Sequence, residues 1–402
     1  MRLKAEDIEE LVSTHESGWS MAQPFYVDPL IFELDMKYIF MSQWLFVGHI
    51  SQIKQPGDYF TFVAGEESII IVRGEDGSIH GHFNVCRHRG SQICLESSGH
   101  VRTLVCPYHQ WVYQLDGALK TARLFEDNFD KSRFGLHSVH VRVLKGLIFI
   151  CMADTPPPFD QIQSDFGPRL QQQRLERAKT AWSEHYTINA NWKLFTENFV
   201  ECYHCLAGHV EYSHIMNTPH EQETAEGAAQ ANTIRETCMK RWRQIGLECS
   251  SISCADDQVH GSSRIVLNEG FVSQSSDGQP VAPLMGSFSE GDVGALVLVI
   301  RPNFWFEAPG DYAWGIWMMP SGPTTTEVRA FWWVHPDAVE GVDYELQRLT
   351  AFWKVTMQQD IALCENNQAG VNSSRYQPGP HGPAETAIDW FTEWYLNKLQ
   401  LG

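Results

Sequence analysis

Two short cysteine–histidine pairs carry the strongest chemical signal in the sequence. One pair is Cys86 and His88, the other is Cys106 and His109, and seventeen residues separate the two motifs. Two thiolates and two imidazoles are the ligand set of a Rieske [2Fe–2S] centre, in which two histidines replace two cysteines on one iron. The sequence therefore predicts a bound iron–sulfur cluster that passes single electrons.

Zinc is the alternative occupant of such a ligand set. A Cys2His2 zinc site usually places its two cysteines together and its two histidines together, whereas each pair here contains one cysteine and one histidine. Each loop can thus offer a sulfur to one iron and a nitrogen to the other. Because Gly90, Gly99 and Gly117 also suit tight ligand loops, the cluster is the preferred interpretation.

A second candidate metal site lies in the segment 191–209, which contains His204 and His209. Non-haem iron enzymes that activate O2 hold Fe(II) with two histidines and one carboxylate on one face of the metal. Five residues exceed one helical turn, so a helix must loosen or end between the two histidines, and Ala207-Gly208 permits this. Such a pair alone is more often structural, and it is the upstream cluster motif that favours iron here.

The two cluster motifs, with their flanking residues 83–90 and 106–117, resemble the N-terminal domain of the α subunits of Rieske non-haem iron oxygenases. The resemblance extends over nearly the whole chain. It implies that the four residues of the two pairs are the cluster ligands. A pattern of four residues resembles the iron-site helix of that family: Asn198, Glu201, His204 and His209.

The resemblance also implies a third iron ligand far along the chain. Asp360 falls where the family places this carboxylate, so His204, His209 and Asp360 are the expected ligands of a mononuclear Fe(II). Glu365 is the alternative carboxylate. A helical salt bridge is the structural alternative for either acidic residue.

Glu201 precedes His204 by three residues, a spacing that would place both side chains on one face of a helix. In the family, an acidic residue at this position bridges a cluster histidine of one subunit to an iron histidine of the neighbouring subunit. The corresponding pair here is His109 and His204, and an exposed helical glutamate is the structural alternative. The resemblance therefore implies a ring-shaped homotrimer in which Glu201 links electron donor to acceptor.

Glutamate at this position, where many ring-hydroxylating members have aspartate, resembles the branch that acts on quaternary ammonium compounds. The resemblance implies a monooxygenase that uses O2 to hydroxylate, and thereby N-demethylate, glycine betaine or a related betaine. A carnitine-type or choline-type monooxygenase, the large subunit of an aromatic ring-hydroxylating dioxygenase and a non-enzymatic electron carrier are the alternatives.

The chain lacks a motif for binding a nicotinamide dinucleotide. No Gly-x-Gly-x-x-Gly run opens a helix after a strand. We therefore expect electrons to come from NAD(P)H through a separate reductase with flavin and iron–sulfur groups.

Aromatic side chains could hold a cationic substrate. The chain has 14 tryptophans, and indole rings attract quaternary ammonium groups through cation–π interactions. Packing in the core of a sheet is the alternative role for any one of them. Five tryptophans cluster in the C-terminal strands: Trp305, Trp314, Trp317, Trp332 and Trp333.

Two domains are expected to position these residues. We predict a helical lead-in over 1–43, a Rieske β domain over 44–153, a linker over 154–180 and a catalytic iron domain over 181–402. Strands followed by a long helix indicate an α+β architecture. The resemblance adds that the catalytic domain is a helix-grip fold, an antiparallel sheet curled around a long helix.

β-Branched and aromatic runs bounded by turn residues predict the strands. We expect helices after the capping residue Asp28, over 168–179 and, as the last element, over 342–366. The stretch 255–292 is rich in Ser, Gly and Asp and is expected to be a mobile loop. The predicted strands are 58–63, 68–73 and 146–151 in the first domain and 295–301, 312–319 and 328–335 in the second.

Composition limits the classes of function. A formal charge of −19 argues against nucleic-acid binding and is compatible with a cationic substrate or a basic redox partner, although acidic surfaces also simply maintain solubility. No apolar run reaches about 18 residues and the acidic N-terminal segment lacks a signal-peptide core, so we expect a cytoplasmic protein without membrane spans. The ten cysteines are then expected to be thiols or metal ligands, with buried thiols at Cys151, Cys202, Cys205 and Cys364.

Overall fold

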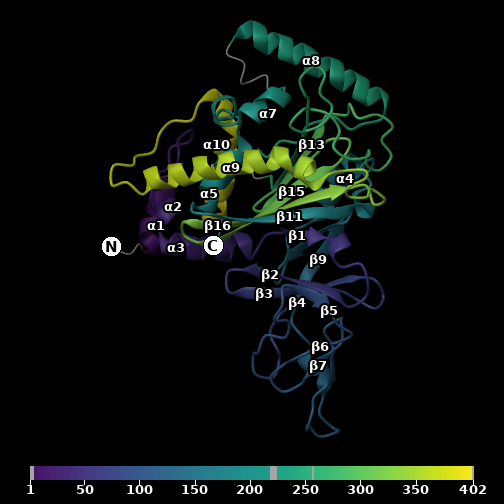
Figure 1. Cartoon of the computed structure of the whole chain (residues 1–402). Helices are drawn as coiled ribbons and strands as arrows, with labels where there is room; N and C mark the ends of the chain where they lie inside the picture. The colour runs from purple at the N-terminus through teal and green to yellow at the C-terminus, as the bar shows by residue number, and fades with distance from the viewer. Residues whose placement is uncertain (1–3, 218–223, 256–257, 401–402) are drawn as a thin grey trace. The chain divides into compact units, whose positions relative to one another are not determined.

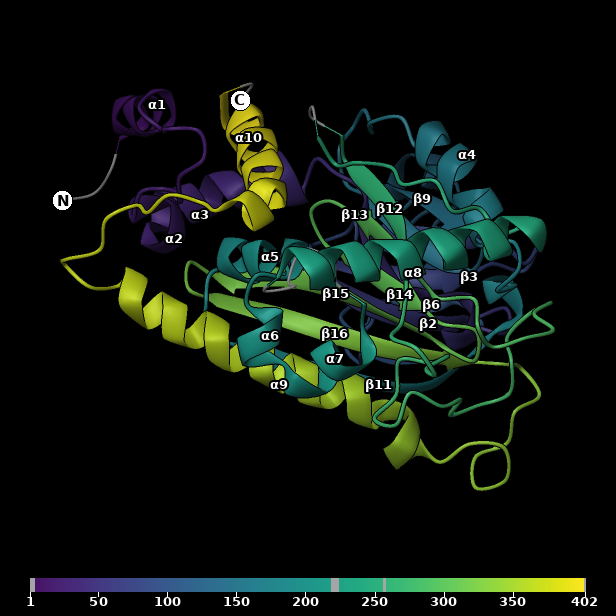
Figure 2. The ribbon, with the colours of Figure 1, turned by 90° about the horizontal axis from the view of Figure 1, so that it is seen from above.

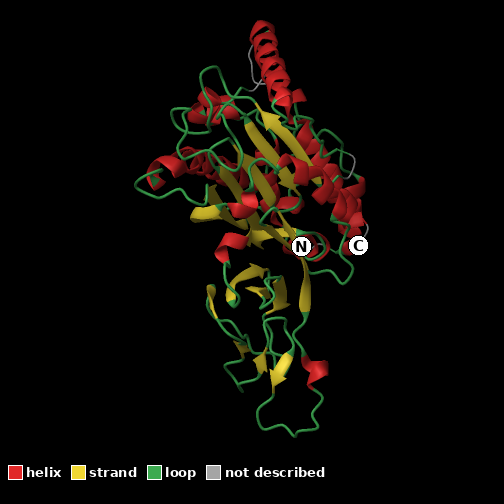
Figure 3. Cartoon of the chain, turned by 90° about the vertical axis from the view of Figure 1, so that its right-hand side faces the viewer, coloured by secondary structure: helices red, strands yellow, loops and turns green. Residues whose placement is uncertain are grey.

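The computed structural model describes residues 4–217, 224–255 and 258–400 and divides the chain into two compact units (Figure 1). One unit is Phe40–Phe159, and the other combines Met1–Ile39 with Asp160–Gly402. Each unit is built on its own antiparallel sheet, and the strands are yellow in Figure 3. The helical lead-in therefore belongs to the same unit as the C-terminal half of the chain.

The unit Phe40–Phe159 is a β domain with a seven-stranded sheet in the order β1-β10-β9-β4-β3-β2-β5. Its centre is an isoleucine- and valine-rich run, and the side chains from Ile69 to Val72 are completely buried. The predictions for 58–63, 68–73 and 146–151 are confirmed. The strands are β1 (Leu45–His49), β2 (Asp58–Ala64), β3 (Glu67–Arg73), β4 (Ile79–Phe83), β5 (Ser98–His100), β9 (Ser138–Leu144) and β10 (Leu147–Cys151).

A small three-stranded sheet, in the order β6-β7-β8, completes this unit. Its strands are β6 (Leu104–Val105), β7 (Val112–Tyr113) and β8 (Leu119–Thr121). The loop between β6 and β7 contains Cys106 and His109, and the loop after β4 contains Cys86 and His88. The two predicted cluster motifs therefore occupy loops of the same domain.

The second unit contains a six-stranded antiparallel sheet in the order β11-β16-β15-β14-β13-β12. The strand predictions for 295–301, 312–319 and 328–335 are confirmed as β13, β15 and β16. The prediction of a loop over 255–292 was wrong at its start, because β12 pairs with the apolar strand β13 there. The strands are β11 (Lys179–Ile188), β12 (His260–Ile265), β13 (Ala295–Ile300), β14 (Phe304–Ala308), β15 (Ala313–Gly322) and β16 (Thr325–Val334).

A long helix, α9 (Leu346–Val371), packs along one face of this sheet (Figure 2). Its buried face presents Phe352, Trp353 and Met357 to strand residues such as Ile316 and Val328. An antiparallel sheet gripping one long helix is the α+β arrangement that was expected for the catalytic domain. The helix begins four residues later and ends five residues later than the predicted 342–366.

One helix prediction was wrong in position, and a helix after the predicted last one was missed. Most of the segment 168–179 is not an α-helix: α4 (Asp160–Arg169) ends where that prediction began, and only a short 3-10 turn (Leu175–Arg177) follows. The buried Ile162 and Phe166, four residues apart, form the packed face of α4. The last helix is α10 (Thr386–Gln400), which packs through Phe391 and Tyr395. The remaining helices are α1 (Ala5–Ser13), α2 (Pro24–Val27), α3 (Pro29–Asp35), α5 (Trp192–Val200), α6 (Cys205–Gly208), α7 (Val210–Ile215) and α8 (Ala225–Gln244).

Several local predictions are confirmed. The carboxylate of Asp28 caps α3 by accepting a hydrogen bond from the Leu30 N–H at 2.8 Å. All ten cysteines are free thiols, and of the four expected to be buried Cys202 is only half-buried. Among the described residues, no helix has the length and apolar character needed to cross a bilayer.

Candidate metal centres and active-site cavity

The two cysteine–histidine pairs of the β domain come together in space. The rings of His88 and His109 contact edge to face, with centroids 4.7 Å apart. Burial, and to a smaller extent the neighbouring Cys106 thiol, raises the pKa of Cys86, while the Tyr113 hydroxyl at 3.2 Å opposes this rise. The two imidazoles thus contact each other, and the two thiols lie close enough to interact.

The chemistry of this group fits a bound metal cluster. Within the described part of the chain, the Nδ1 atom of His88 is buried without a hydrogen-bond partner. A buried polar atom of this kind is normally paired, and a metal would supply the missing partner. The indole of Trp111 stacks on the His88 ring with centroids 4.9 Å apart and holds its orientation. These loops could therefore hold a [2Fe–2S] cluster.

The second pair of histidines lies where the helical path of the chain breaks. His204 directly precedes α6, and His209 separates α6 from α7 with φ −132° and ψ 75°. The expected break between the two histidines is confirmed. Glu201, however, does not share a helical face with His204, because α5 ends at Val200 and Glu201 has an extended backbone.

The structure brings a carboxylate from α9 to these two histidines. Asp360 Oδ1 lies 2.8 Å from His209 Nε2 and 3.4 Å from His204 Nε2, and the two Nε2 atoms are 3.1 Å apart. Glu365 points elsewhere and accepts hydrogen bonds from the backbone and side chain of Asn189. Two imidazoles and one carboxylate thus converge, a donor set that could hold Fe(II).

The other ring nitrogen of each histidine, Nδ1, also has a hydrogen-bond partner, and this contact orients the ring. Glu201 Oε1 lies 2.5 Å from His204 Nδ1, and Gln359 Oε1 lies 2.9 Å from His209 Nδ1. Burial alone would lower the pKa of His204, but its hydrogen bonds with Asp360 and Glu201 outweigh burial and raise the pKa to about 10. Such outer contacts leave the Nε2 atoms directed at a common point, as metal-binding histidines require.

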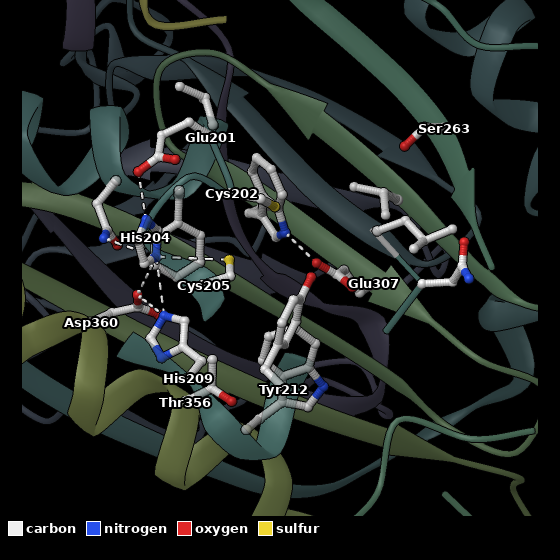
Figure 4. Close-up of a pocket in the computed structure, with 18 of the residues that line it drawn as sticks. Glu201, Cys202, His204, Cys205, His209, Tyr212, Ser263, Glu307, Thr356 and Asp360 are labelled. Carbon is white, nitrogen blue, oxygen red and sulfur yellow. Dashed lines mark hydrogen bonds and ion pairs between the residues drawn. The ribbon is translucent and has the colours of Figure 1, made fainter. Parts of the chain in front are cut away.

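A cavity of about 290 Å3 opens next to this group. Figure 4 shows His204, His209 and Asp360 gathered at one side of the cavity, with Glu307 apart from them. Its aromatic walls are Phe199, Tyr212, Trp305 and Trp353. A small substrate in this cavity would therefore lie between the candidate metal site and an aromatic surface.

The predicted tryptophan cage is only partly correct. Of the five tryptophans proposed from the sequence, Trp305 lines the cavity, and the other four are not among the described residues that line it. Trp314 stacks on Trp353 with ring centroids 3.9 Å apart, and Trp332 and Trp333 are buried in the sheet core. Their indoles alternate between sheet faces, so nearness in sequence did not mean a shared cavity.

Three residues that line or support the site were missed from the sequence. Gln359 precedes Asp360, and Trp353 lies two helical turns before Asp360 on α9, so helical spacing could have indicated Trp353. Glu307 follows Trp305 by two positions on β14, which places both on the same face of the strand. That alternation is the signal that could have identified Glu307.

Comparisons with known proteins agree with this geometry. Residues 43–128 match the Rieske [2Fe-2S] domain, and residues 175–401 match the family described as ring hydroxylating alpha subunit (catalytic domain). The glycine betaine monooxygenase oxygenase subunit of Chromohalobacter salexigens is 37% identical over 97% of this chain and 88% of its own length. A carnitine monooxygenase oxygenase subunit from Acinetobacter pittii is 31% identical over 54% of this chain and 62% of its own length.

Solved structures show the same fold. A quaternary ammonium Rieske monooxygenase in complex with L-carnitine superimposes with a TM-score of 0.72 and 22% sequence identity, covering 99% of each chain. The family matches, the full-length relative and the shared fold lead to one conclusion. The chain belongs to the family of Rieske non-haem iron oxygenases, as an α subunit with a ring-hydroxylating type of catalytic domain.

Proposed function

We propose that this protein is the oxygenase component of a two-component monooxygenase that N-demethylates a quaternary ammonium compound such as glycine betaine. The observation that carries the proposal is the convergence of His204, His209 and Asp360 beside a cavity with aromatic walls. The similarity to a glycine betaine monooxygenase oxygenase subunit over 97% of the chain supports the substrate class.

The overall reaction balances with external electrons. One oxygen atom of O2 enters a methyl C–H bond of the substrate, and the other leaves as water after uptake of two electrons and two protons. The resulting N-hydroxymethyl group breaks its C–N bond, which releases formaldehyde and leaves the tertiary amine. For glycine betaine the amine product is dimethylglycine.

Family membership implies a Rieske cluster and a mononuclear iron, which supply electron transfer and O2 activation when bound. We propose that the domain 44–153 holds the cluster and the domain 181–402 holds the iron. In this proposal His204, His209 and Asp360 hold the iron, and Glu201 orients His204 through its Nδ1 atom. The proposed cluster ligands are Cys86, His88, Cys106 and His109.

The electron donor and the assembly are also part of the proposal. Electrons come from NAD(P)H through a separate flavin and iron–sulfur reductase. The oxygenase forms a homotrimer in which Glu201 bridges His204 to His109 of a neighbouring subunit. The cytoplasm is the proposed location, since NAD(P)H for the reductase is available there.

The test is product formation by the holoenzyme with a reductase, NADH and O2. We expect formaldehyde and dimethylglycine in equal amounts from glycine betaine, and none from an Asp360→Ala variant. Carnitine, choline and an aromatic substrate are supplied in parallel. Trimethylamine from carnitine, betaine aldehyde from choline or a dihydrodiol from the aromatic substrate, formed faster than dimethylglycine, would replace the proposed reaction with the corresponding alternative.

A further inference from the structure

Glu307 is a buried carboxyl group that lines the cavity without an ionic partner. It lies on β14, its side chain is 2% exposed, and Figure 4 shows it among the residues around the cavity. Two uncharged donors reach its oxygens, namely Trp305 Nε1 at 3.0 Å and Gln274 Nε2 at 2.6 Å. Within the described ranges, no ion pair includes Glu307, so its charge is unbalanced.

Two other buried carboxylates of this unit have a basic partner, whereas Asp311 accepts hydrogen bonds from uncharged donors, the Ser273 hydroxyl and the Val281 N–H. Asp35 is paired with the Lys193 ammonium group and Asp360 with the His209 imidazole. An unpaired buried carboxylate costs several kcal/mol unless it takes up a proton. Burial accordingly raises the pKa of Glu307 to about 7. The cavity thus contains a carboxyl group whose ionised form a cationic ligand would stabilise.

The residues that directly contact Glu307 are uncharged, whereas charged side chains lie elsewhere on the cavity wall. Its neighbours on the adjacent strands are Val297 and Trp314. Its negative charge also adds a small part to the rise that burial causes in the pKa of nearby Tyr312. Arg235 on α8 and the buried Arg264 on β12 also line the cavity and supply positive charge there. The cavity therefore contains acidic and basic side chains, which suits a zwitterion.

The hydrogen bonding of Glu307 narrows the type of cation. Each of its oxygens already accepts one hydrogen bond from an uncharged donor of the protein, so a cation has to supply charge rather than a hydrogen-bond donor to hold it in place. A quaternary ammonium group has no N–H and needs only charge and aromatic surface. Trp305 supplies that surface, because it is half-buried, lines the cavity and is held by an edge contact with Phe199 at 5.7 Å.

We infer that the Glu307 carboxylate and the Trp305 indole form the subsite that holds the trimethylammonium end of the substrate. The inference rests on the proposed function and adds the residues that select the cation. When substrate enters, Glu307 loses its proton to solvent and becomes the counter-ion. The indole N–H of Trp305 and the Gln274 amide keep the carboxylate in place for this contact.

The test compares two ligands of equal shape on the resting holoenzyme. Glycine betaine carries the quaternary nitrogen, and 3,3-dimethylbutanoate has carbon in its place. We expect a Glu307→Gln variant to lose at least about tenfold in affinity for glycine betaine and to keep its affinity for the carbon analogue. The new amide can still accept the indole N–H, so the wall of the cavity is retained.

Glu184 provides a matched control. It accepts the indole N–H of Trp182, two residues earlier on β11, at 2.6 Å, but it is paired with Lys354 at 2.8 Å and does not line the cavity. A Glu184→Gln variant should bind both ligands as the wild type does. Calorimetry near pH 7 in two buffers should also show that glycine betaine, but not the analogue, releases part of a proton from the wild type.

Equal loss of both ligands in Glu307→Gln, unchanged preference for the cation, or no proton release from the wild type would overturn the assignment. These results are separable from failure of the proposed function. Absence of amine product from every quaternary ammonium compound with the wild type would overturn both. Turnover of glycine betaine with an unchanged preference in Glu307→Gln would overturn only the role of Glu307.

Discussion

Two carboxylates on one helix have different surroundings, and this difference decides which can serve the candidate iron site. Asp360 reaches both imidazoles, whereas Glu365, five residues later, accepts hydrogen bonds from Asn189. Residues five apart on an α-helix point about 140° apart. The rotation of α9 therefore selects Asp360.

Replacing each carboxylate in a separate variant tests this selection. We expect Asp360→Ala to lose its mononuclear iron while keeping the visible absorption of the [2Fe–2S] cluster, because only one metal site loses an oxygen donor. Glu365→Gln is the control and should retain both metals. The measurement is metal analysis with absorption spectroscopy, and iron loss in Glu365→Gln alone would reverse the assignment.

The protonation of a single carboxyl group, that of Glu197, makes the unfolding free energy depend on pH. Burial raises its pKa to about 8 from an ordinary 4.5, and its partner Tyr26 donates a hydrogen bond at 2.9 Å. The folded state keeps this proton over a range in which the unfolded chain loses it. The contribution to stability is therefore complete below about pH 4.5 and is lost as the pH rises to about 8.

A Glu197→Gln variant cannot lose this proton. Between about pH 5 and pH 8, its unfolding free energy should rise relative to the wild type by up to about 1.4 kcal/mol per pH unit. Denaturant midpoints of both proteins across this range provide the measurement. A difference that stays constant with pH would show that Glu197 is ionised in the folded protein.

At the scale of elements, one buried carboxylate joins three helices of the catalytic unit. Asp35 at the end of α3 forms an ion pair with Lys193 and accepts a hydrogen bond from Trp192 Nε1 at 2.8 Å, both on α5. It also accepts one from the Tyr395 hydroxyl on α10 at 2.7 Å. This network attaches the lead-in and the last helix to α5, the helix that precedes Glu201 and His204.

Removing one charge of this network should be more harmful than removing both. We expect Asp35→Asn to lower the unfolding free energy by about 3–5 kcal/mol, because Lys193 stays buried without its counter-ion. Adding Lys193→Met should recover much of that loss. Chemical denaturation of Asp35→Asn, Lys193→Met and the double variant measures this, and additive losses would contradict a coupled pair.

At the scale of the whole molecule, the proposed cluster ligands and the proposed iron ligands belong to different compact units. In the proposed homotrimer, each iron receives electrons from the cluster of a neighbouring subunit. A defect in one site could then be complemented by a subunit with the opposite defect. Such complementation distinguishes transfer between subunits from transfer within one chain.

Mixed oligomers test this arrangement. A Cys86→Ser variant without cluster and an Asp360→Ala variant without iron should each be inactive. Co-expressed in equal amounts, they should recover about a quarter of the wild-type activity, because a quarter of the sites then pair an intact iron with an intact neighbouring cluster. No recovery, with oligomers of both chains demonstrated, would contradict transfer between subunits.

The sequence by itself determined the features that depend on short spacing. The two cysteine–histidine pairs, the two histidines around a helix break and the main strands are local patterns, and the structure agrees with their placement. Prediction from local sequence patterns failed at two helices. The helix predicted from Pro168 onward is instead α4, which ends at Arg169, and α10 was missed although Phe391 and Tyr395 have helical spacing.

Only the tertiary structure decided the contacts between distant segments. Helix rotation selected Asp360 over Glu365, and the pleat of the sheet placed Trp305 and Glu307 in the cavity but Trp332 and Trp333 in the core. Residue types and spacing reveal which groups can do chemistry. Which of them face one cavity depends on how α9 packs on the sheet, and that packing joins residues more than one hundred positions apart.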